Sequence, residues 1–325
     1  MTRRPTPEAS MGDKTNDQNT HNDQRSMSGL VLVTGAAGGQ QGKTGRHVAE
    51  GLLKRGVAVR AFVRTDDERP AALRELGAEV VVGDLREIRD VEPALDGVDR
   101  VFFTYPVADG LLAATAVMAA AAKEAGIRRL VDVSFPITKT TSISPRARQH
   151  WVSERIFEAA NIGAVHVRAA AFFENVAGIG KLARNGEFAA AFGPPDGVMA
   201  LVAGSDVARV ATGVLADAAF PAQPYYRLIS TVLTVGELVD EIGIQLGTPL
   251  RYVEVEEVQW REKAIAEGVD PEHAGHLSRW GRALADMAKH GDIYHKVTTD
   301  IEKVIGAPPL ALRDFLQAVA KSAAD

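Results

Sequence analysis

Residues 30–48 read Leu30-Val-Leu-Val-Thr-Gly35-Ala-Ala-Gly38-Gly39-Gln-Gln-Gly42-Lys-Thr-Gly45-Arg-His-Val48, and they decide the fold. The short apolar run predicts a buried parallel strand, because a strand covered on both faces needs no alternation of polar and apolar residues. Glycines follow, and apolar residues then recur at helical spacing from Val48. Strand, glycine-rich turn and helix together form the context in which a glycine pattern indicates a dinucleotide site.

The glycine spacing departs from the simplest pattern. Gly35 and Gly38 begin a Gly-x-x-Gly-x-x-Gly series, but its third position is Gln41. The phase of the helix favours Gly45 instead, so we interpret residues 39–42 as a lengthened phosphate loop. Glycine takes positive φ without strain and lets the backbone approach a pyrophosphate, which the free N–H groups of a helix start then bind. We predict that Gly35, Gly38, Gly42 and Gly45 bind the cofactor; the alternative is a turn without a ligand.

Composition limits the class of protein. The chain has 325 residues, 46% hydrophobic and 24% charged, with a formal net charge of −5, which argues against a nucleic-acid surface. It has no cysteine, which excludes disulfides, thiolate metal sites and cysteine nucleophiles. No apolar run is long enough to span a bilayer, and we expect a cytoplasmic protein. Residues 1–27 are polar and predicted to be disordered, so Met27 is an alternative to Met1 as the true start.

Further strands are predicted at residues 57–63, 79–82, 100–104, 129–133 and 165–167, with helices at 111–126 and 146–160. This alternation predicts an α/β fold with a doubly wound parallel Rossmann-like sheet over residues 28–180. Beyond residue 180 the expected elements are shorter and mixed. We predict a smaller C-terminal lobe over residues 181–325, on the substrate side and partly interleaved with the first domain.

The second strand ends at Arg64, where an NAD site usually carries an acidic residue. An arginine can bind a 2′-phosphate in bidentate fashion, so the sequence favours NADP(H) over NAD(H), although Asp66 and Asp67 follow closely. Asp84, at the end of the third strand, can bond the adenine amino group or cap a helix. Topology places Tyr105, Pro106 and Ser134 at the nicotinamide side, because ligands bind at the carboxyl ends of such strands.

Three further features of the sequence each allow two interpretations. Arg146, Arg148 and Arg155 form a basic helix face that is either solvated or able to attract an acidic substrate. His273 and His276 lie one helical turn apart, but without an acidic partner at matching spacing they favour a solvated helix face, and we predict no metal site. The tryptophans are core or cleft aromatics, and both readings stay open.

Several motifs in this order together resemble NmrA-like proteins, which are atypical short-chain dehydrogenase/reductases. The motifs are Thr34-Gly-Ala-Ala-Gly38, Arg60-Ala-Phe-Val-Arg64, Gly83-Asp-Leu85, Gln149-His-Trp151 and Phe172-Phe-Glu-Asn175. The resemblance runs from Leu30 to the C-terminus and implies a Rossmann-like domain that binds NAD(P)(H) beneath a small lobe. Members of the family include reductases of quinones, dyes and phenylpropanoids, and also catalytically silent nucleotide sensors that bind other proteins.

The resemblance also implies roles for single residues. Gly35, Gly38 and Gly45 would line the pyrophosphate, Arg64 the 2′-phosphate, Asp84 and Leu85 the adenine, Tyr105, Pro106 and Ser134 the nicotinamide ribose, and Phe173 and Asn175 the substrate cleft. We also predict Phe172, with Phe173, as the apolar edge of that cleft. Ordinary short-chain dehydrogenases carry Tyr-x-x-x-Lys on the helix after the fifth strand, and the corresponding residues here are His150 and Glu154. His150 is the candidate proton donor, because histidine titrates near neutral pH; the alternative is a helix residue that bonds the loop above it.

We therefore expect an NAD(P)H-dependent oxidoreductase that transfers hydride to a quinone-like or conjugated small molecule. The alternative is a catalytically silent NADP(H) sensor that acts through protein partners. Neither hypothesis requires direct contact with nucleic acid or a membrane.

Overall fold

The computed structural model describes residues 29–39, 42–180, 185–283 and 295–322. The predicted disordered tail and the candidate start at Met27 lie outside these ranges. Among the helices of the described ranges, none has the length and apolar character needed to cross a bilayer.

A parallel sheet of seven strands forms the centre of the larger lobe, in the order β10-β6-β5-β4-β1-β2-β3. The strands are β1 (Leu30–Thr34), β2 (Val59–Val63), β3 (Glu79–Val82), β4 (Val98–Phe103), β5 (Arg129–Ser134), β6 (Ala164–Ala169) and β10 (Tyr225–Leu228). The chain order reverses between β1 and β4, which is the switch point at which doubly wound sheets bind ligands. The predicted fold class is confirmed.

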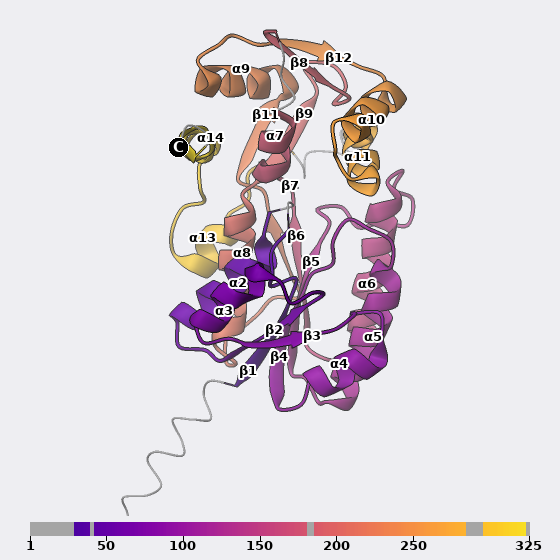
Figure 1. Cartoon of the computed structure of the whole chain (residues 1–325), viewed down its shortest axis with the longest axis vertical. Helices are drawn as coiled ribbons and strands as arrows, with labels where there is room; N and C mark the ends of the chain where they lie inside the picture. The colour runs from indigo at the N-terminus through magenta and orange to yellow at the C-terminus, as the bar shows by residue number, and fades with distance from the viewer. Residues whose placement is uncertain (1–28, 40–41, 181–184, 284–294, 323–325) are drawn as a thin grey trace, which may run out of the picture.

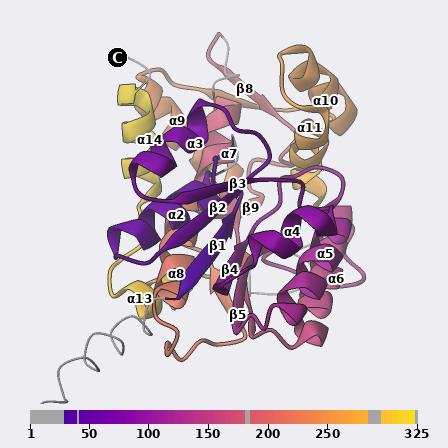
Figure 2. The ribbon, with the colours of Figure 1, turned by 60° about the horizontal axis from the view of Figure 1, so that its bottom comes forward.

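Helices cover both faces of this sheet (Figure 1; Figure 2). On one face lie α2 (Thr44–Lys54), α3 (Glu68–Glu75), α8 (Gly204–Ala216) and α13 (Asp300–Ile305), and on the other α4 (Ile88–Ala94), α5 (Leu111–Glu124) and α6 (Pro145–Ala160). A buried apolar cluster lies on each face, one around Val33 and Val48 and the other around Phe103 and Phe157. This double coverage explains why the central strands are apolar along their whole length.

Two arginines join the large sheet to a helix that follows residue 180. Arg100, which is 1% exposed, donates from Nη1 to the Leu215 carbonyl at the end of α8. Arg129 donates to the carbonyls of Val214 and Phe220, each at 2.8 Å. Cations suit these positions because the last carbonyls of a helix carry partial negative charge and have no partner within the helix.

The outer edge of β10 is covered by a segment from near the C-terminus. The Thr298 N–H donates to the Ile229 carbonyl at 2.9 Å, and Asp300 accepts from the Arg227 N–H at 2.9 Å. Both α8 and β10 therefore belong to the layers of the large sheet although they follow residue 180. The domain boundary at residue 180 stays a prediction.

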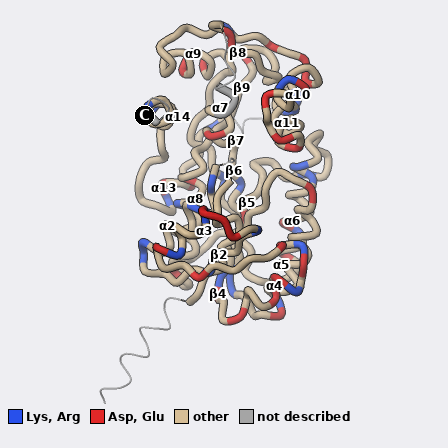
Figure 3. The backbone as a smooth tube through the Cα atoms, in the orientation of Figure 1, with Lys and Arg blue, Asp and Glu red and all other residues tan. Residues whose placement is uncertain are grey.

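The smaller lobe carries two short sheets and its own apolar cluster, which contains Phe173, Phe188 and Trp260. Its elements are β7 (Ala171–Phe172), α7 (Phe173–Gly180), β8 (Glu187–Ala190), β9 (Val198–Val202), β11 (Thr231–Thr234), α9 (Val235–Leu246), β12 (Arg251–Glu254), α10 (Glu257–Ala266), α11 (Pro271–Ser278) and α14 (Leu312–Ser322). Basic and acidic residues are interspersed along the chain (Figure 3).

Candidate functional site

A cavity of about 720 Å³ follows the carboxyl edge of the large sheet and continues against the smaller lobe. Because this edge is where doubly wound sheets bind ligands, the cavity is the candidate site. The predicted site residues that line it are Gly35, Gly38, Arg64, Asp84, Leu85, Tyr105, Pro106, Ser134, His150, Phe172 and Asn175. Those that do not line it are Gly42, Gly45 and Phe173.

The turn after β1 is shaped to receive an anion. Gly35 and Gly38 have φ values of 64° and 73°, and the Gly38 N–H donates to the Gly35 carbonyl at 3.1 Å. Gly39 faces open space where a side chain would stand. Helix α2 has no side-chain cap at its N-terminus and no acidic residue in its first turn. Its first N–H groups therefore remain available to a pyrophosphate.

Gly45 and Gly42 both pack closely against neighbouring parts of the protein. A Cβ on Gly45 would lie 2.5 Å from the Thr34 carbonyl oxygen and 2.6 Å from that of Gly35, so only glycine lets α2 pack this closely on β1. Gly42 has a φ of 66°, and a Cβ there would lie 2.6 Å from the Phe172 ring. The end of the lengthened loop is thus held against Phe172, while residues 40–41 lie outside the described ranges.

The end of β2 brings two arginines to the cavity. Arg64 lies 2.8 Å from Asp84 and is 65% exposed. Arg69 in α3 donates to the Gly38 carbonyl at 3.2 Å, a contact that sequence reasoning missed. Arg86 donates to both carboxylate oxygens of Asp84 and, with Arg64, lowers the pKa of Asp84 to about 2. Asp84 is therefore ionised and already engaged by guanidinium groups, so a bond to adenine would compete with them.

Tyr105 and Ser134 line the middle of the cavity but are bonded to the protein. The Tyr105 hydroxyl donates to the Asp109 carbonyl at 3.0 Å, and burial raises its pKa, so the phenol is neutral. The buried Ser134 hydroxyl donates to Glu154 Oε1 at 2.7 Å. The Ser134 bond leads away from the cavity to a charged cluster behind its wall.

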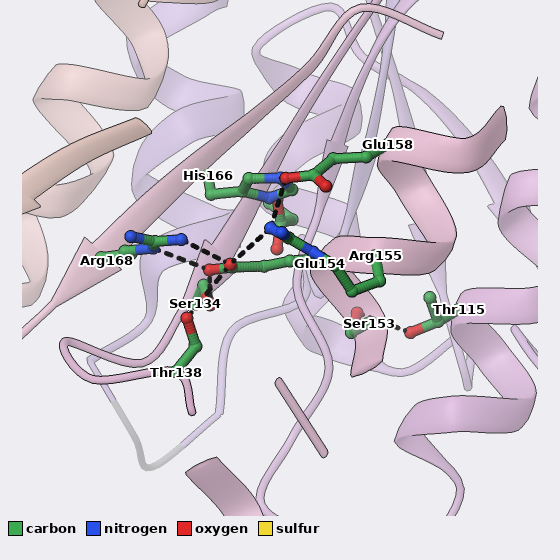
Figure 4. Close-up of polar contacts among 10 residues, drawn as sticks. Thr115, Ser134, Thr138, Ser153, Glu154, Arg155, Glu158, His166 and Arg168 are labelled. Carbon is green, nitrogen blue, oxygen red and sulfur yellow. Dashed lines mark hydrogen bonds and ion pairs between the residues drawn. The ribbon is translucent and has the colours of Figure 1, made fainter. Parts of the chain in front are cut away.

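Glu154 is the centre of that cluster (Figure 4). It is 0% exposed and accepts from Arg168 Nε at 2.9 Å, from Arg168 Nη2 at 2.7 Å and from Thr138 Oγ1 at 3.1 Å. Burial alone would raise the pKa of Glu154, but the hydrogen bonds from Arg168 and Ser134 outweigh it and lower the pKa. Glu154, which the sequence aligns with the expected lysine of ordinary short-chain dehydrogenases, is therefore a carboxylate that ties β5 and the following loop to β6.

His166 lies close to this cluster (Figure 4) and forms a second buried pair. His166 Nδ1 on β6 lies 2.5 Å from Asp132 Oδ1 on β5. Burial opposes the charged imidazole, yet Asp132 raises the pKa of His166. Neither residue lines the cavity, so this pair joins β5 to β6.

Four rings form one end of the cavity, which we name the aromatic box: Phe135, His150, His276 and Trp280. Helix α6 places His150 there, and it starts with Ser144 as its N-cap and Pro145 in its first turn. The rings of Phe135 and His150 are stacked with centroids 5.5 Å apart, and the Phe135 and His276 rings meet edge to face at 5.8 Å. The expectation that His276 faces solvent is therefore wrong.

Both imidazoles of the aromatic box are neutral near pH 7. Burial, followed by the positive charge of Arg146, lowers the pKa of His150 to about 4. Burial, followed by His273 and Arg146, lowers the pKa of His276 to about 3. A group with so low a pKa holds almost no proton to donate near pH 7, so the position of His150 suits a cavity wall better than a general acid.

These low pKa values predict how stability depends on pH. Unfolding returns each imidazole to its ordinary pKa, so the unfolded chain binds more protons below about pH 6.5, and stability falls as the pH is lowered toward 4. We expect His150 to account for on the order of 1 to 2 kcal/mol of the loss between about pH 7 and pH 5. Urea unfolding of the protein and of His150→Asn would measure this, and equal losses in both proteins would contradict it.

The three residues predicted to line the substrate cleft lie in two different environments. Phe172 and Asn175 line the cavity. Phe173 begins α7, is fully buried and packs against Phe315 at 5.5 Å between ring centroids, so it belongs to the core of the smaller lobe. The buried Asn175 Oδ1 has no hydrogen-bond partner among the described residues, so it is free to accept from a bound molecule.

Sequence reasoning missed several cavity residues, namely Lys43, Arg69, Phe135, His276 and Arg279, and it left open whether Trp280 is a core or a cleft residue. Phe135 could have been found, because it directly follows Ser134 at the end of a central strand. His276 and Arg279 carried no such signal, because no sequence pattern places the helices of the smaller lobe over the sheet.

A doubly wound parallel sheet whose first turn holds positive-φ glycines defines a Rossmann-like protein. Within that class the chain belongs to the NmrA-like family, whose model matches residues 27–316.

Similar proteins extend this assignment. The chain is 27% identical over 292 residues to an NAD(P)H azoreductase of Xenophilus azovorans, covering 89% of this chain and 97% of that protein. Two solved structures share the fold. An NADPH-dependent quinone oxidoreductase of Escherichia coli, complexed with NADPH, has a TM-score of 0.76 at 22% identity, with coverage of 89% and 99%. The Citrobacter triphenylmethane reductase complexed with NADP(H) has a TM-score of 0.74 at 23% identity, with coverage of 90% and 99%.

Proposed function

We propose that this protein is an NAD(P)H-dependent reductase that passes a hydride to a quinone-like or otherwise conjugated small molecule. The observation that carries the proposal is one continuous cavity that joins the glycine turn after β1 to the aromatic box. Family membership and the azoreductase, quinone reductase and dye reductase activities of similar proteins support it.

The residues of the cavity fit a nicotinamide dinucleotide. Gly35, Gly38 and the start of α2 would hold the pyrophosphate, and Arg64 with Arg69 would hold the far ribose. The unpartnered Oδ1 of Asn175 would accept from an amide donor such as the nicotinamide carboxamide. We propose Tyr105 and Pro106 as contacts of the nearer ribose.

A reduced nicotinamide supplies a hydride, and the protein orients the acceptor and excludes water. The aromatic box offers flat apolar walls for a planar acceptor. The acceptor gains two electrons and one proton from the hydride and a second proton from the medium, so that a quinone becomes a hydroquinone. Because the pKa of His150 is about 4, we infer that the second proton comes from solvent.

We propose that the site prefers NADP(H), since Arg64 and Arg69 both reach the cavity near the end of β2. Replacing both with alanine should weaken NADPH binding about 10- to 100-fold and NADH binding much less, because charge-assisted bonds to a phosphate contribute about 1.5 to 3 kcal/mol. Calorimetric titration with the two cofactors measures the difference.

Arg74→Ala is the matched control for this pair. Arg74 is an exposed arginine on α3, the helix that carries Arg69; it pairs with Asp66 and does not line the cavity. Equal weakening of NADPH and NADH in the double variant would show that these arginines do not read the 2′-phosphate.

The function itself is tested by following NADPH oxidation across a panel of quinones, azo dyes and enones. Sustained oxidation with stoichiometric reduction of an acceptor is the expected result. Tight cofactor binding without oxidation of NADPH by any acceptor would overturn the reductase and favour the nucleotide-sensor alternative.

A further inference from the structure

The acceptor end of the cavity combines aromatic walls with positive charge. Arg146 and Arg279 line it together with the aromatic box, and Arg146 lies one turn before His150 on α6. Arg146 is partly buried, and its Nη2 donates to the Ala108 carbonyl at 3.0 Å. Among the described residues, no carboxylate lies within ion-pair distance of this guanidinium.

The charge of Arg146 therefore lacks full compensation. Burial lowers the pKa of Arg146, and the nearby Glu272 and Asp109 raise it by less. A guanidinium has five N–H donors in a planar fork, and the Ala108 carbonyl accepts a hydrogen bond from Nη2 alone. The remaining donors are suited to an anion in the cavity.

Arg279 adds a second cation near the same end. Its Nε lies 3.7 Å from Glu257, a long contact, and its side chain is 41% exposed. Two exposed carboxylates, those of Asp109 and Glu272, also line the cavity and attract Arg146, but neither forms an ion pair with it and burial outweighs their effect on its pKa. The two histidines of the aromatic box are neutral near pH 7 and repel neither an anion nor an apolar ring.

We propose that the acceptor is a planar aromatic molecule with an anionic substituent, a carboxylate or a sulfonate. Its ring lies in the aromatic box, and its anionic group is held by Arg146, with Arg279 nearby. This inference rests on the proposed reductase function and adds the charge of the substrate to it. Arg64, Arg69 and the start of α2 are the candidate contacts of the cofactor phosphates, whereas Arg146 and Arg279 both lower the pKa of His276 and so lie near the aromatic box.

The test uses three dyes with one chromophore: 1-phenylazo-2-naphthol with hydrogen, sulfonate or trimethylammonium at the para position of the phenyl ring. Dissociation constants are measured by equilibrium dialysis with saturating NADP⁺, so that no turnover is needed. We expect the sulfonate to bind about 10-fold or more tightly than the trimethylammonium dye, a difference of about 1.4 kcal/mol.

Variants assign this preference to Arg146. Arg146→Gln should reduce the ratio between the two charged dyes to near one, whereas Arg146→Lys should retain part of it. Arg148→Gln is the matched control, because Arg148 lies on the same helix, is exposed and does not line the cavity; the charge preference should persist there. The NADPH affinity of each variant shows whether the cofactor half of the cavity is intact.

The outcomes separate the two proposals. Equal binding of the three dyes, or equal weakening of all of them in Arg146→Gln, overturns the anionic acceptor. Reduction of the dyes without a charge preference leaves the reductase standing and removes only this inference. Charge-selective binding without NADPH oxidation supports the anion site and overturns the reductase.

Discussion

Valine in place of Gly45 is expected to abolish dinucleotide binding and to destabilise the protein by about 3 kcal/mol or more, at the upper end of overpacking effects. The atoms that the new Cβ would meet, at 2.5 to 2.6 Å, are the backbone carbonyl groups of Thr34 and Gly35. Backbone in a central strand and its turn cannot rotate away as a long side chain does. Helix α2 would have to move off β1, and its N-terminus would leave the pyrophosphate position.

Urea unfolding and calorimetric titration with NADPH measure these two effects. Gly39→Ala is the control for stability, because a Cβ at Gly39 meets no atom within 4 Å. Wild-type stability in the Gly45 variant would show that α2 does not depend on this close approach to β1.

Removing the carboxylate of Glu154 should cost about 3 to 5 kcal/mol of stability, the range for breaking a buried ion pair by deleting one partner. Glu154→Ala deletes the acceptor of Ser134, of Thr138 and of both Arg168 nitrogens in one step. Ser134 and Thr138 flank the segment that carries Phe135. We therefore expect Phe135 to be held less firmly in the aromatic box. The affinity for the dye should then fall by more than the smaller folded fraction of the protein accounts for.

Glu158→Ala is the matched control, because Glu158 lies one turn later on α6 but is 42% exposed, pairs with Arg155 and approaches the buried His166 only at 3.5 Å. A surface pair of this kind contributes about 1 kcal/mol or less. If the two variants lose the same stability in urea unfolding, the central role of Glu154 in the cluster is wrong.

The sequence predicted the nucleotide half of the cavity because its residues are local to single βα units. Gly35, Gly38 and Arg64 each follow a strand directly, and parallel strands bring their carboxyl ends to one edge. Gly45 shows the limit of this reasoning. Its position relative to the helix predicted a required glycine, but the sequence could not show whether the requirement comes from helix packing or from a ligand. The structure shows the close packing.

The acceptor half was predicted only in part. His150, Phe172 and Asn175 line the cavity as expected, but the residues from the smaller lobe depend on contacts between distant segments. Gly281 packs directly on the backbone of Ala191 and Gly193, which brings the neighbouring Trp280 to the cavity. Phe172 and Phe173 differ for a related reason. Helix α7 begins at Phe173, so the two neighbouring rings point to opposite sides, one to the cavity and one to the core.

The sheet edge at β10 constrains how the chain can fold during synthesis. Strands β1 to β6 have all been synthesised once the chain reaches Ala169. The outer edge of β6 stays unpaired until β10 (Tyr225–Leu228) pairs with it. The edge of β10 is in turn covered only after Thr298 has been synthesised. A nascent chain that has left the ribosome as far as residue 180 thus exposes an unpaired strand edge, a template for aggregation. We expect the first half, expressed alone, to depend on chaperones or to precipitate, and separately made halves to regain solubility only when they are folded together.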